Sequence, residues 1–507
     1  MRRGIMRRLT PDSVSLGRFA ALFTARFLGN ASEVPEAIRE AIAAEEHGQR
    51  EKEQLVDSRS VVFASAASAD HRPRIAAAEA FDIAAAALPR PPNFCFMNLS
   101  LDYAGMMDSP EVVWFNLCRM NGVSPSSVRP QQLHMMGGTV RHQRPGGGYI
   151  QILLGCVPDL GGESFTFDTI PEEEELADSK NLPAALCMVF MDNKLTLQHE
   201  HVLSERLQLL SRRLGDVPVV GGVFPATQLP GTSTRLSTLE DNKDAEVGAG
   251  ESCEDEMGDS VFFLNERIYS GSIAGVVLRS AMLKAHHVGV VPSISLAKVK
   301  LTGARRITDG KLVISSLDNK RAADVIRDLY CSSELEGKPS KVFLAFQHED
   351  RYIPVSFTGY PHSGELLLSV PEGVQAVAGA TVELVVDDVE LDTEASAGLL
   401  IGLQNKLSIV HVEKDINVAR EGRKNIVASS AAALHFSHGG MNAIAKPEVN
   451  LTLGRSSVMY APSVLQRCLG SVCPTAGVFC PGQILSLGRT TGIFARSGSY
   501  CVLEGLK

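Results

Sequence analysis

Two passages of this chain follow the same strand–helix–strand pattern, and each ends in a pair of glycines. In the first, the apolar run "FCFMNLSL" leads through a helix around Trp114 to "MMGGTV", which holds Gly137 and Gly138. In the second, "PAALCMVFMD" leads through "EHVLSERLQLLSRRLG" to "VPVVGGVFPATQ", which holds Gly221 and Gly222. Continuous apolar runs of this kind indicate strands that are buried on both faces. The recurrence predicts two related α/β halves within one N-terminal domain.

Length and composition indicate how many domains to expect. The chain has 507 residues, of which 44% are hydrophobic and 21% are charged. This composition is typical of a folded protein, and the length exceeds what one core usually organises. We expect an α/β domain over residues 61–316 and a β-rich domain over residues 317–507. The expected class is mixed, between α+β and α/β, with two domains whose mixed sheets are flanked by helices.

Two segments have compositions that differ from those of the expected domains. Residues 1–32 carry six arginines and one acid, which is typical of a mitochondrial presequence. We therefore expect a mitochondrial location, with the cytoplasm as the alternative, and a helical linker over residues 33–60. Residues 240–259 hold nine acids and one lysine with few apolar residues. They predict a disordered acidic insertion over about residues 232–259.

Charge and motif content exclude several classes of function. The net charge of -9 does not favour nucleic acid as a partner, because phosphate-backbone binding needs a dense basic surface. No apolar run has the length of a membrane-spanning helix, so no membrane insertion is expected. The ten cysteines are scattered without a C-x-x-C pair, which favours reduced thiols in a reducing compartment. No nucleotide-binding loop or hydrolase motif is present, and we expect no cofactor, no metal and no catalytic residue.

The stretch "AGVFCPGQILSLG" near the C-terminus places a thiol and a carboxamide between two glycines. Gly477 and Gly482 would let the backbone approach a ligand closely, and Gln483 could both donate and accept hydrogen bonds. In a second interpretation, Phe479 and Cys480 fill the core where a strand turns. A third, in which Cys480 is a nucleophile, requires a lowered thiol pKa.

A rival hypothesis is a cysteine- or metal-dependent hydrolase. Cys468, Cys473 and Cys480 lie close together in the sequence, and His435 and His438 precede them. Zinc sites of thiolates and imidazoles need four such ligands in a tetrahedron. The spacings of five and seven positions between these cysteines do not match a zinc knuckle, so the sequence favours a non-catalytic protein.

The order of the motifs resembles the FIST family, named for F-box and intracellular signal transduction proteins, over about residues 61–503. The segments that carry the resemblance are "FASAASADHRPRIAAAEAF", "MMGGTV", "VPVVGGVFPATQ", "IYSGSIAGVVL", "KVFLAFQ" and "AGVFCPGQI". In three places the chain departs from the family pattern. Gln483 replaces a glutamate, and Val290 and Val291 replace a Cys-Arg pair before Pro292. The arginine segment expected before the final motif is indistinct, with Arg455 in "LTLGRSSVMYAPS". No F-box is apparent.

The resemblance implies a sensory or scaffold module that binds a small ligand such as an amino acid. The residues expected to line that site are Gly137, Gly138, Gly221, Gly222, Pro292, Phe479, Cys480, Gly482 and Gln483. The expected partner is a small molecule or another protein. The alternative is a structural subunit or adaptor of a larger organellar assembly.

Overall fold

The computed structural model describes the chain from Ser60 to Leu506 with several gaps. The residues not described within that range are 101–107 (except Tyr103), 126–132, 141–147, 168–181, 225–260, 291–292, 309–310, 332–341, 349–350, 356, 361–362, 371–375, 388, 419–421, 438–472 (except Leu465, Cys468 and Leu469), 488–489 and 496–497. The expected leader, nearly all of the linker and the acidic insertion lie outside the described residues, as does Pro292.

One four-stranded unit occurs three times in the structure, where the sequence predicted two related halves. The strands of the first repeat are β1 (Val62–Ser68), β2 (Phe94–Ser100), β3 (His134–Val140) and β4 (Ile150–Cys156). Those of the second are β5 (Gly161–Thr166), β6 (Ala184–Asp192), β7 (Val219–Phe224) and β10 (Ile273–Arg279). Those of the third are β11 (Leu283–Val290), β22 (Ala431–Ser437), β23 (Thr475–Phe479) and β26 (Gly498–Gly505).

The three repeats share one strand order. In each sheet the first strand of the repeat pairs with the fourth, the fourth with the second, and the second with the third. The second and third strands are parallel, whereas the other two pairings are antiparallel. The mixed class expected from the sequence is therefore confirmed, and the two predicted halves are the first and second repeats.

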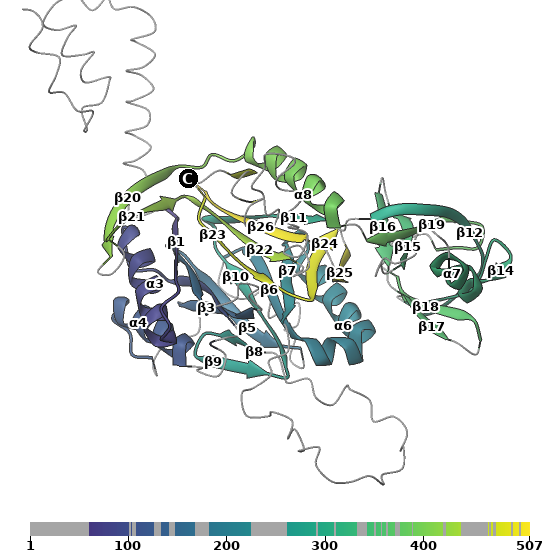
Figure 1. Cartoon of the computed structure of the whole chain (residues 1–507), viewed down its shortest axis with the longest axis horizontal. Helices are drawn as coiled ribbons and strands as arrows, with labels where there is room; N and C mark the ends of the chain where they lie inside the picture. Colours follow the sequence, from purple (N-terminus) through teal and green to yellow (C-terminus); the bar gives the residue numbers. More distant parts are fainter. Residues whose placement is uncertain are drawn as a thin grey trace, which may run out of the picture.

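Hairpins extend two of these sheets from a neighbouring repeat. The pair β8 (Val261–Leu264) and β9 (Arg267–Ser270) follows β7 in the chain but adds to β3. Likewise β24 (Gly482–Leu487) and β25 (Thr490–Ala495) follow β23 but add to β7. A further hairpin, β20 (His411–Val418) and β21 (Gly422–Ser429), pairs with β1. The sheets are thus interlocked by strands from distant parts of the sequence (Figure 1).

The sheets enclose one inner core and carry helices on their outer faces (Figure 1). Helices α3 (Pro73–Ala87) and α4 (Asp108–Met120) pack outside the first sheet, and α6 (Asn193–Leu214) packs outside the second. Helix α8 (Val389–Gln404) packs on β11. The continuous apolar runs follow from this arrangement, because each strand sends alternate residues to the inner core and to a helix. No helix among the described residues is long and apolar enough to cross a membrane.

Aromatic rings from all three repeats meet in the inner core. The Phe190 ring of the second repeat lies 5.5 Å from that of Phe224 and 6.4 Å from that of Phe436 in the third. Phe96 of the first repeat lies 6.0 Å from Phe436 in an edge-to-face arrangement, which aromatic pairs prefer. The three sheets therefore share one core, to which each repeat contributes aromatic side chains.

An antiparallel module is inserted between the first and second strands of the third repeat. It consists of β12 (Ser293–Thr308), β13 (Lys311–Leu317), β14 (Lys320–Arg321), α7 (Ala322–Tyr330), β15 (Val342–His348), β16 (Arg351–Val355), β17 (Phe357–Tyr360), β18 (Glu365–Ser369) and β19 (Thr381–Asp387). The module has its own hydrophobic core and lies at one side of the molecule (Figure 1). The expected boundary after residue 316 falls at the end of β13, and the division of the chain there stays a prediction.

The first glycine of each predicted pair is required by the backbone. Gly137 has φ +147° and Gly221 has φ +152°. A Cβ atom at either position would lie 1.8 Å from the carbonyl oxygen of the parallel neighbour, Met97 or Val189. Only glycine avoids both the unfavourable dihedral and this overlap.

We predict that Gly221→Ala lowers the free energy of unfolding by about 3 kcal/mol, because backbone strain adds to steric overlap. Urea denaturation would measure the loss. The control is Gly398→Ala on the exposed side of α8, where a Cβ meets nothing within 4 Å; helix propensity predicts no loss there. Equal effects of the two substitutions would contradict the prediction.

Candidate functional site

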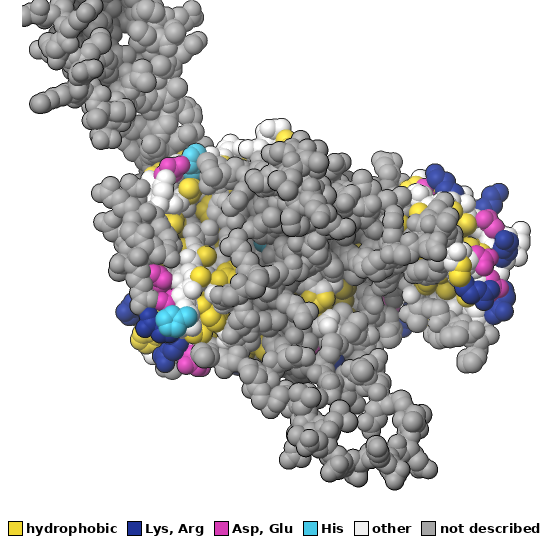
Figure 2. Space-filling view, viewed as in Figure 1, with side chains coloured by type: hydrophobic (Ala, Val, Ile, Leu, Met, Phe, Trp, Pro, Cys, Tyr) yellow, Lys and Arg dark blue, Asp and Glu magenta, His cyan; other side chains and the backbone are white. Residues whose placement is uncertain are grey.

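A groove is lined by residues of helix α4 and of the β8–β9 hairpin, two elements that are labelled in Figure 1. Its volume is about 390 Å³. The lining residues are Arg74, Asp108, Pro110, Glu111, Val112, Trp114, Phe115, Pro125, Met135, Asn265, Glu266 and Ile268. They combine an apolar floor with charged side chains, and Figure 2 shows hydrophobic and charged side chains together over α3 and α4.

The apolar side chains of the groove are unusually accessible. Phe115 is 54% exposed and Ile268 is 41% exposed. Trp114 beside them is buried, and its indole Nε1 has no hydrogen-bond acceptor among the described residues. Exposed apolar side chains gathered in one hollow mark a binding surface more often than single ones do. The groove therefore offers accessible apolar area, whereas the Trp114 N–H is buried.

The charged side chains of the groove are mostly acidic. Asp108, Glu111 and Glu266 line it, and Arg74 is the one basic side chain among the described lining residues. Arg74 Nη1 lies 3.7 Å from Asp108 Oδ2, and both side chains are more than half exposed. Exposed ion pairs of this kind contribute little to stability. They can open at small cost, so Arg74 and Asp108 are both available to a ligand.

The negative charge of Glu266 also affects a buried residue of α4. Burial, together with the negative charge of Glu266, raises the pKa of Cys118 on α4 to about 11. Glu266 itself pairs with its exposed neighbour Arg267 at 3.8 Å. The groove thus favours a ligand that carries positive charge.

One rim of the groove is fixed to the first sheet by an asparagine. Asn265 at the tip of the β8–β9 hairpin has φ +54°, a conformation that asparagine tolerates better than most residues. Its backbone N–H donates to the Met135 carbonyl oxygen at 2.6 Å, and its Oδ1 accepts from the Met135 N–H at 3.1 Å. Glu266 and Ile268 are therefore held at a defined position beside β3.

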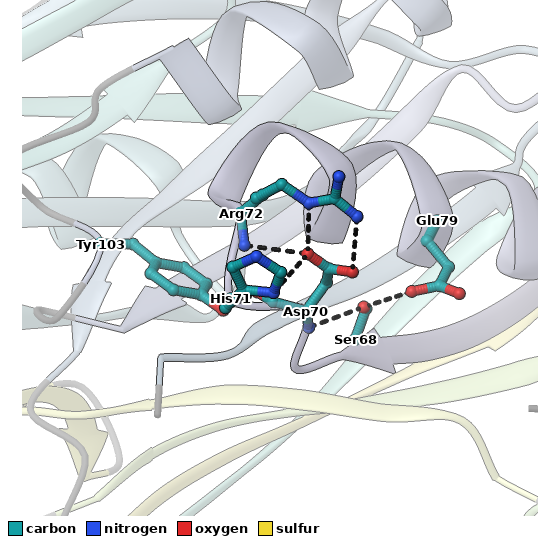
Figure 3. A network of polar contacts seen from close by, with 6 residues as sticks. All are labelled: Ser68, Asp70, His71, Arg72, Glu79 and Tyr103. Carbon is teal, nitrogen blue, oxygen red and sulfur yellow. Dashed lines mark hydrogen bonds and ion pairs between the residues drawn. The ribbon is translucent and has the colours of Figure 1, made fainter. Parts of the chain in front are cut away.

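A polar network fixes the start of α3, from which Arg74 extends. Figure 3 shows its members, Ser68, Asp70, His71, Arg72, Glu79 and Tyr103. The Asp70 carboxylate accepts from the Arg72 backbone N–H at 2.9 Å and from Arg72 Nε at 3.1 Å. The Ser68 hydroxyl donates to Glu79 Oε2 at 2.6 Å, and the Tyr103 hydroxyl donates to the Asp70 carbonyl oxygen. These contacts define the first turn of the helix.

The second glycine of each predicted pair lies where two repeats meet. A Cβ atom at Gly138 would lie 2.3 Å from the ring of Phe224, and one at Gly222 would lie 2.6 Å from Cys480 Sγ. Phe224 and Cys480 occupy corresponding positions, because each ends or follows the third strand of the next repeat. The glycines therefore make room for a side chain of the neighbouring sheet.

Cys480 and Gln483 are part of the same buried contact. Cys480 is 1% exposed and Gln483 is 0% exposed. Gln483 Nε2 donates to the Cys480 carbonyl oxygen at 2.7 Å, and Gly482 and Gln483 pair with Val223 and Gly222. Burial raises the pKa of the Cys480 thiol to about 12, so this thiol is protonated at neutral pH.

None of the predicted site residues that the structure describes lines the groove. The structure brings Gly222, Cys480, Gly482 and Gln483 together, and it places Gly137 and Gly138 in β3 of the first repeat. The side chain of Phe479 and all of Pro292 lie outside the described residues. Whether any of these residues contacts a ligand stays a prediction.

Sequence reasoning missed the groove residues, although one signal was present. Trp114 and Phe115 are neighbours on a helix, where consecutive side chains point about 100° apart. Two such rings rarely both face one core, and an exposed aromatic residue was therefore to be expected. The hairpin around Asn265 and Glu266 carried no comparable signal.

The residues of the rival hydrolase hypothesis are only partly described. His435 is 2% exposed, its Nδ1 lies 3.2 Å from the Ser437 hydroxyl, and burial lowers its pKa to about 3. Within the described part of the chain, no three His, Cys, Asp or Glu side chains are grouped as metal ligands would be. His438 lies outside that part.

The comparisons with known proteins add no relative. No family model matches the chain, and no curated protein is significantly similar to it in sequence.

We predict that Gly222→Ala lowers the free energy of unfolding by about 2 kcal/mol, because its methyl group would overlap Cys480 Sγ. Removing the sulfur in Gly222→Ala/Cys480→Ala should relieve part of the overlap. The double variant is then destabilised by less than the sum of the single variants in a double-mutant cycle. Additive losses would show that Cys480 does not fill the space above Gly222.

The buried His435 makes stability depend on pH. Burial lowers its pKa to about 3 in the folded chain, against about 6.5 for an unperturbed histidine, so the unfolded chain binds the proton more readily. The stabilisation is complete above about pH 6.5 and falls with pH below it, by up to about 1.4 kcal/mol per unit. We predict that urea midpoints between pH 7 and 5 fall less steeply in His435→Gln than in the unsubstituted protein, and an unchanged slope would contradict this.

Proposed function

We propose that the protein is a non-catalytic binding protein of the sensory or scaffold type, and that the groove beside α4 takes a small zwitterionic ligand with an apolar side chain. An amino acid has this chemistry. The observation that carries the proposal is the groove itself, in which exposed Phe115 and Ile268 adjoin an exposed Arg74–Asp108 ion pair. The order of motifs that resembles the FIST family supports the same type of protein.

The groove matches each part of such a ligand. The Arg74 guanidinium can pair with a carboxylate, and Asp108 or Glu111 can accept from an ammonium group. An apolar side chain would cover Phe115 and Ile268, which now face solvent. The groove volume of about 390 Å³ lies within the usual range of small-molecule sites.

The state of the thiols supports a non-catalytic role. Burial raises the pKa of Cys473, Cys480 and Cys501 to about 12. A nucleophilic thiol needs the opposite, a lowered pKa and access to substrate. For the location of the protein we propose the mitochondrion, a proposal supported by the arginine-rich residues 1–32.

The experiment is a thermal-shift screen of the full chain against amino acids and common metabolites. A ligand at about 100 times its Kd stabilises the folded state by about 2.7 kcal/mol. We predict a hit that Phe115→Ala and Arg74→Gln each weaken at least tenfold. The matched control is Leu399→Ala on α8, because Leu399 is 53% exposed and lies outside the groove.

Two results would contradict the proposal. One is the absence of stabilisation across the whole panel. The other is a hit that both Phe115→Ala and Arg74→Gln leave unchanged, since such a ligand would bind elsewhere.

A further inference from the structure

The first and second repeats carry equivalent hairpins at one edge of their sheets. In the first repeat, Gly137 pairs with Phe263, which pairs with Ile268. The corresponding row of the second repeat runs across β7, β24 and β25 through Gly221, Ile484 and Ile493. Because both rows start at a glycine of the same backbone conformation, Ile268 and Ile493 occupy matching places in the two sheets.

A helix covers this place in the second repeat. Helix α6 packs along β25, and Ile493 packs against the hydrophobic cluster of α6. The side chains that α6 contributes to that cluster are Leu203, Leu207, Leu210 and Leu214. Their spacing of three or four residues forms one apolar stripe along the helix.

In the first repeat, no described helix covers the same place. Helix α4 has 13 residues where α6 has 22, and Ile268 is 41% exposed where Ile493 is only partly accessible. The space between α4 and the hairpin is the groove described above. The groove thus corresponds to a helix-covered surface whose cover is incomplete in this repeat.

We infer that the groove is the docking site of one amphipathic, basic helix from a partner protein, and that this helix and the small ligand exclude each other. The inference rests on the proposed role of the groove as a binding site and names its protein partner. The helix lays an apolar stripe on Phe115 and Ile268, in the manner of α6 on Ile493. This is the helix-in-groove mode of recognition.

Charge complementarity indicates which charge the side chains of the partner helix carry. The described lining residues of the groove include three acids and one arginine, so basic residues beside the apolar stripe are favoured. Helix α6 itself has this character, with four basic and two acidic residues in 22. A peptide with the sequence of α6 is therefore a suitable probe.

Competition follows from overlap. The helix and the small ligand would both contact Phe115, Ile268 and Glu111, so only one can be bound at a time. A ligand that binds only the helix-free state lowers the apparent affinity for the helix by mass action, and the reverse holds equally. Such coupling converts ligand concentration into partner release, which is the action of a sensor.

The experiment measures fluorescence anisotropy of a fluorescein-labelled peptide of residues 193–214 titrated with the full chain. Saturable binding is expected. Ile268→Ala and Phe115→Ala should each weaken it at least fivefold, and Glu111→Lys should weaken it more at low than at high salt. The matched control Ile493→Ala, in the second repeat, should change the affinity less than twofold, as should Leu399→Ala. A peptide with alanine at positions 203, 207 and 210 should bind at least tenfold more weakly.

The inference is overturned by a lack of saturable binding, or by binding that Ile268→Ala leaves unchanged. It is distinguishable from the proposed function. If an amino acid stabilises the protein in a way that depends on Phe115 but the peptide does not bind, the helix-docking inference is wrong and the small-ligand proposal stands. If the peptide binds in a way that depends on Ile268 but no small molecule stabilises the protein, the small-ligand proposal is wrong and the helix-docking inference stands. A stabilising amino acid that fails to displace the peptide overturns the competition.

Discussion

The close approach of the three sheets at the inner core is the contact on which the rest of the structure depends. It is possible because Gly138 and Gly222 have no side chain where Phe224 and Cys480 of the next repeat must fit. Interiors are packed nearly as densely as organic crystals, so even one added methyl group forces neighbours to move. The interlocking hairpins, which pair strands of one repeat with the sheet of another, require the same close approach.

Because the inner core is closed, the side chains that a ligand can reach lie on the outer surface. The rings of Phe96, Phe190 and Phe436 fill the centre, and the buried thiols are held in their protonated state. The groove lies where the repeats differ, because the shorter α4 does not cover the hairpin as α6 covers β25. Divergence between repeats of one architecture has thus produced a charged, partly apolar hollow without changing the core.

The sequence predicted those parts of the fold that have a local signature. The apolar runs and glycine pairs identified the first and second repeats. The sequence did not predict the third repeat, for two reasons. Residues 291–430 separate β11 from β22, and the third strand of this repeat has a single glycine, Gly477, followed by Val478. For the stretch around Cys480 and Gln483 the sequence left pocket lining and core packing both open. The structure shows both side chains buried at the junction of two sheets, and contact with a ligand there stays a prediction.

By itself the sequence determined the mixed class and the buried strands, because apolar periodicity acts over a few residues. The need for glycine at Gly137 and Gly221 comes from the tertiary structure, since a side chain there would overlap the carbonyl oxygen of a neighbouring strand. Only the tertiary structure decided that Cys480 meets Gly222, and that Arg74, Phe115 and Ile268 line one groove. These contacts join residues far apart in the chain, and exposure depends on which distant element covers a surface. No local pattern records that a covering helix is shorter in one repeat than in another.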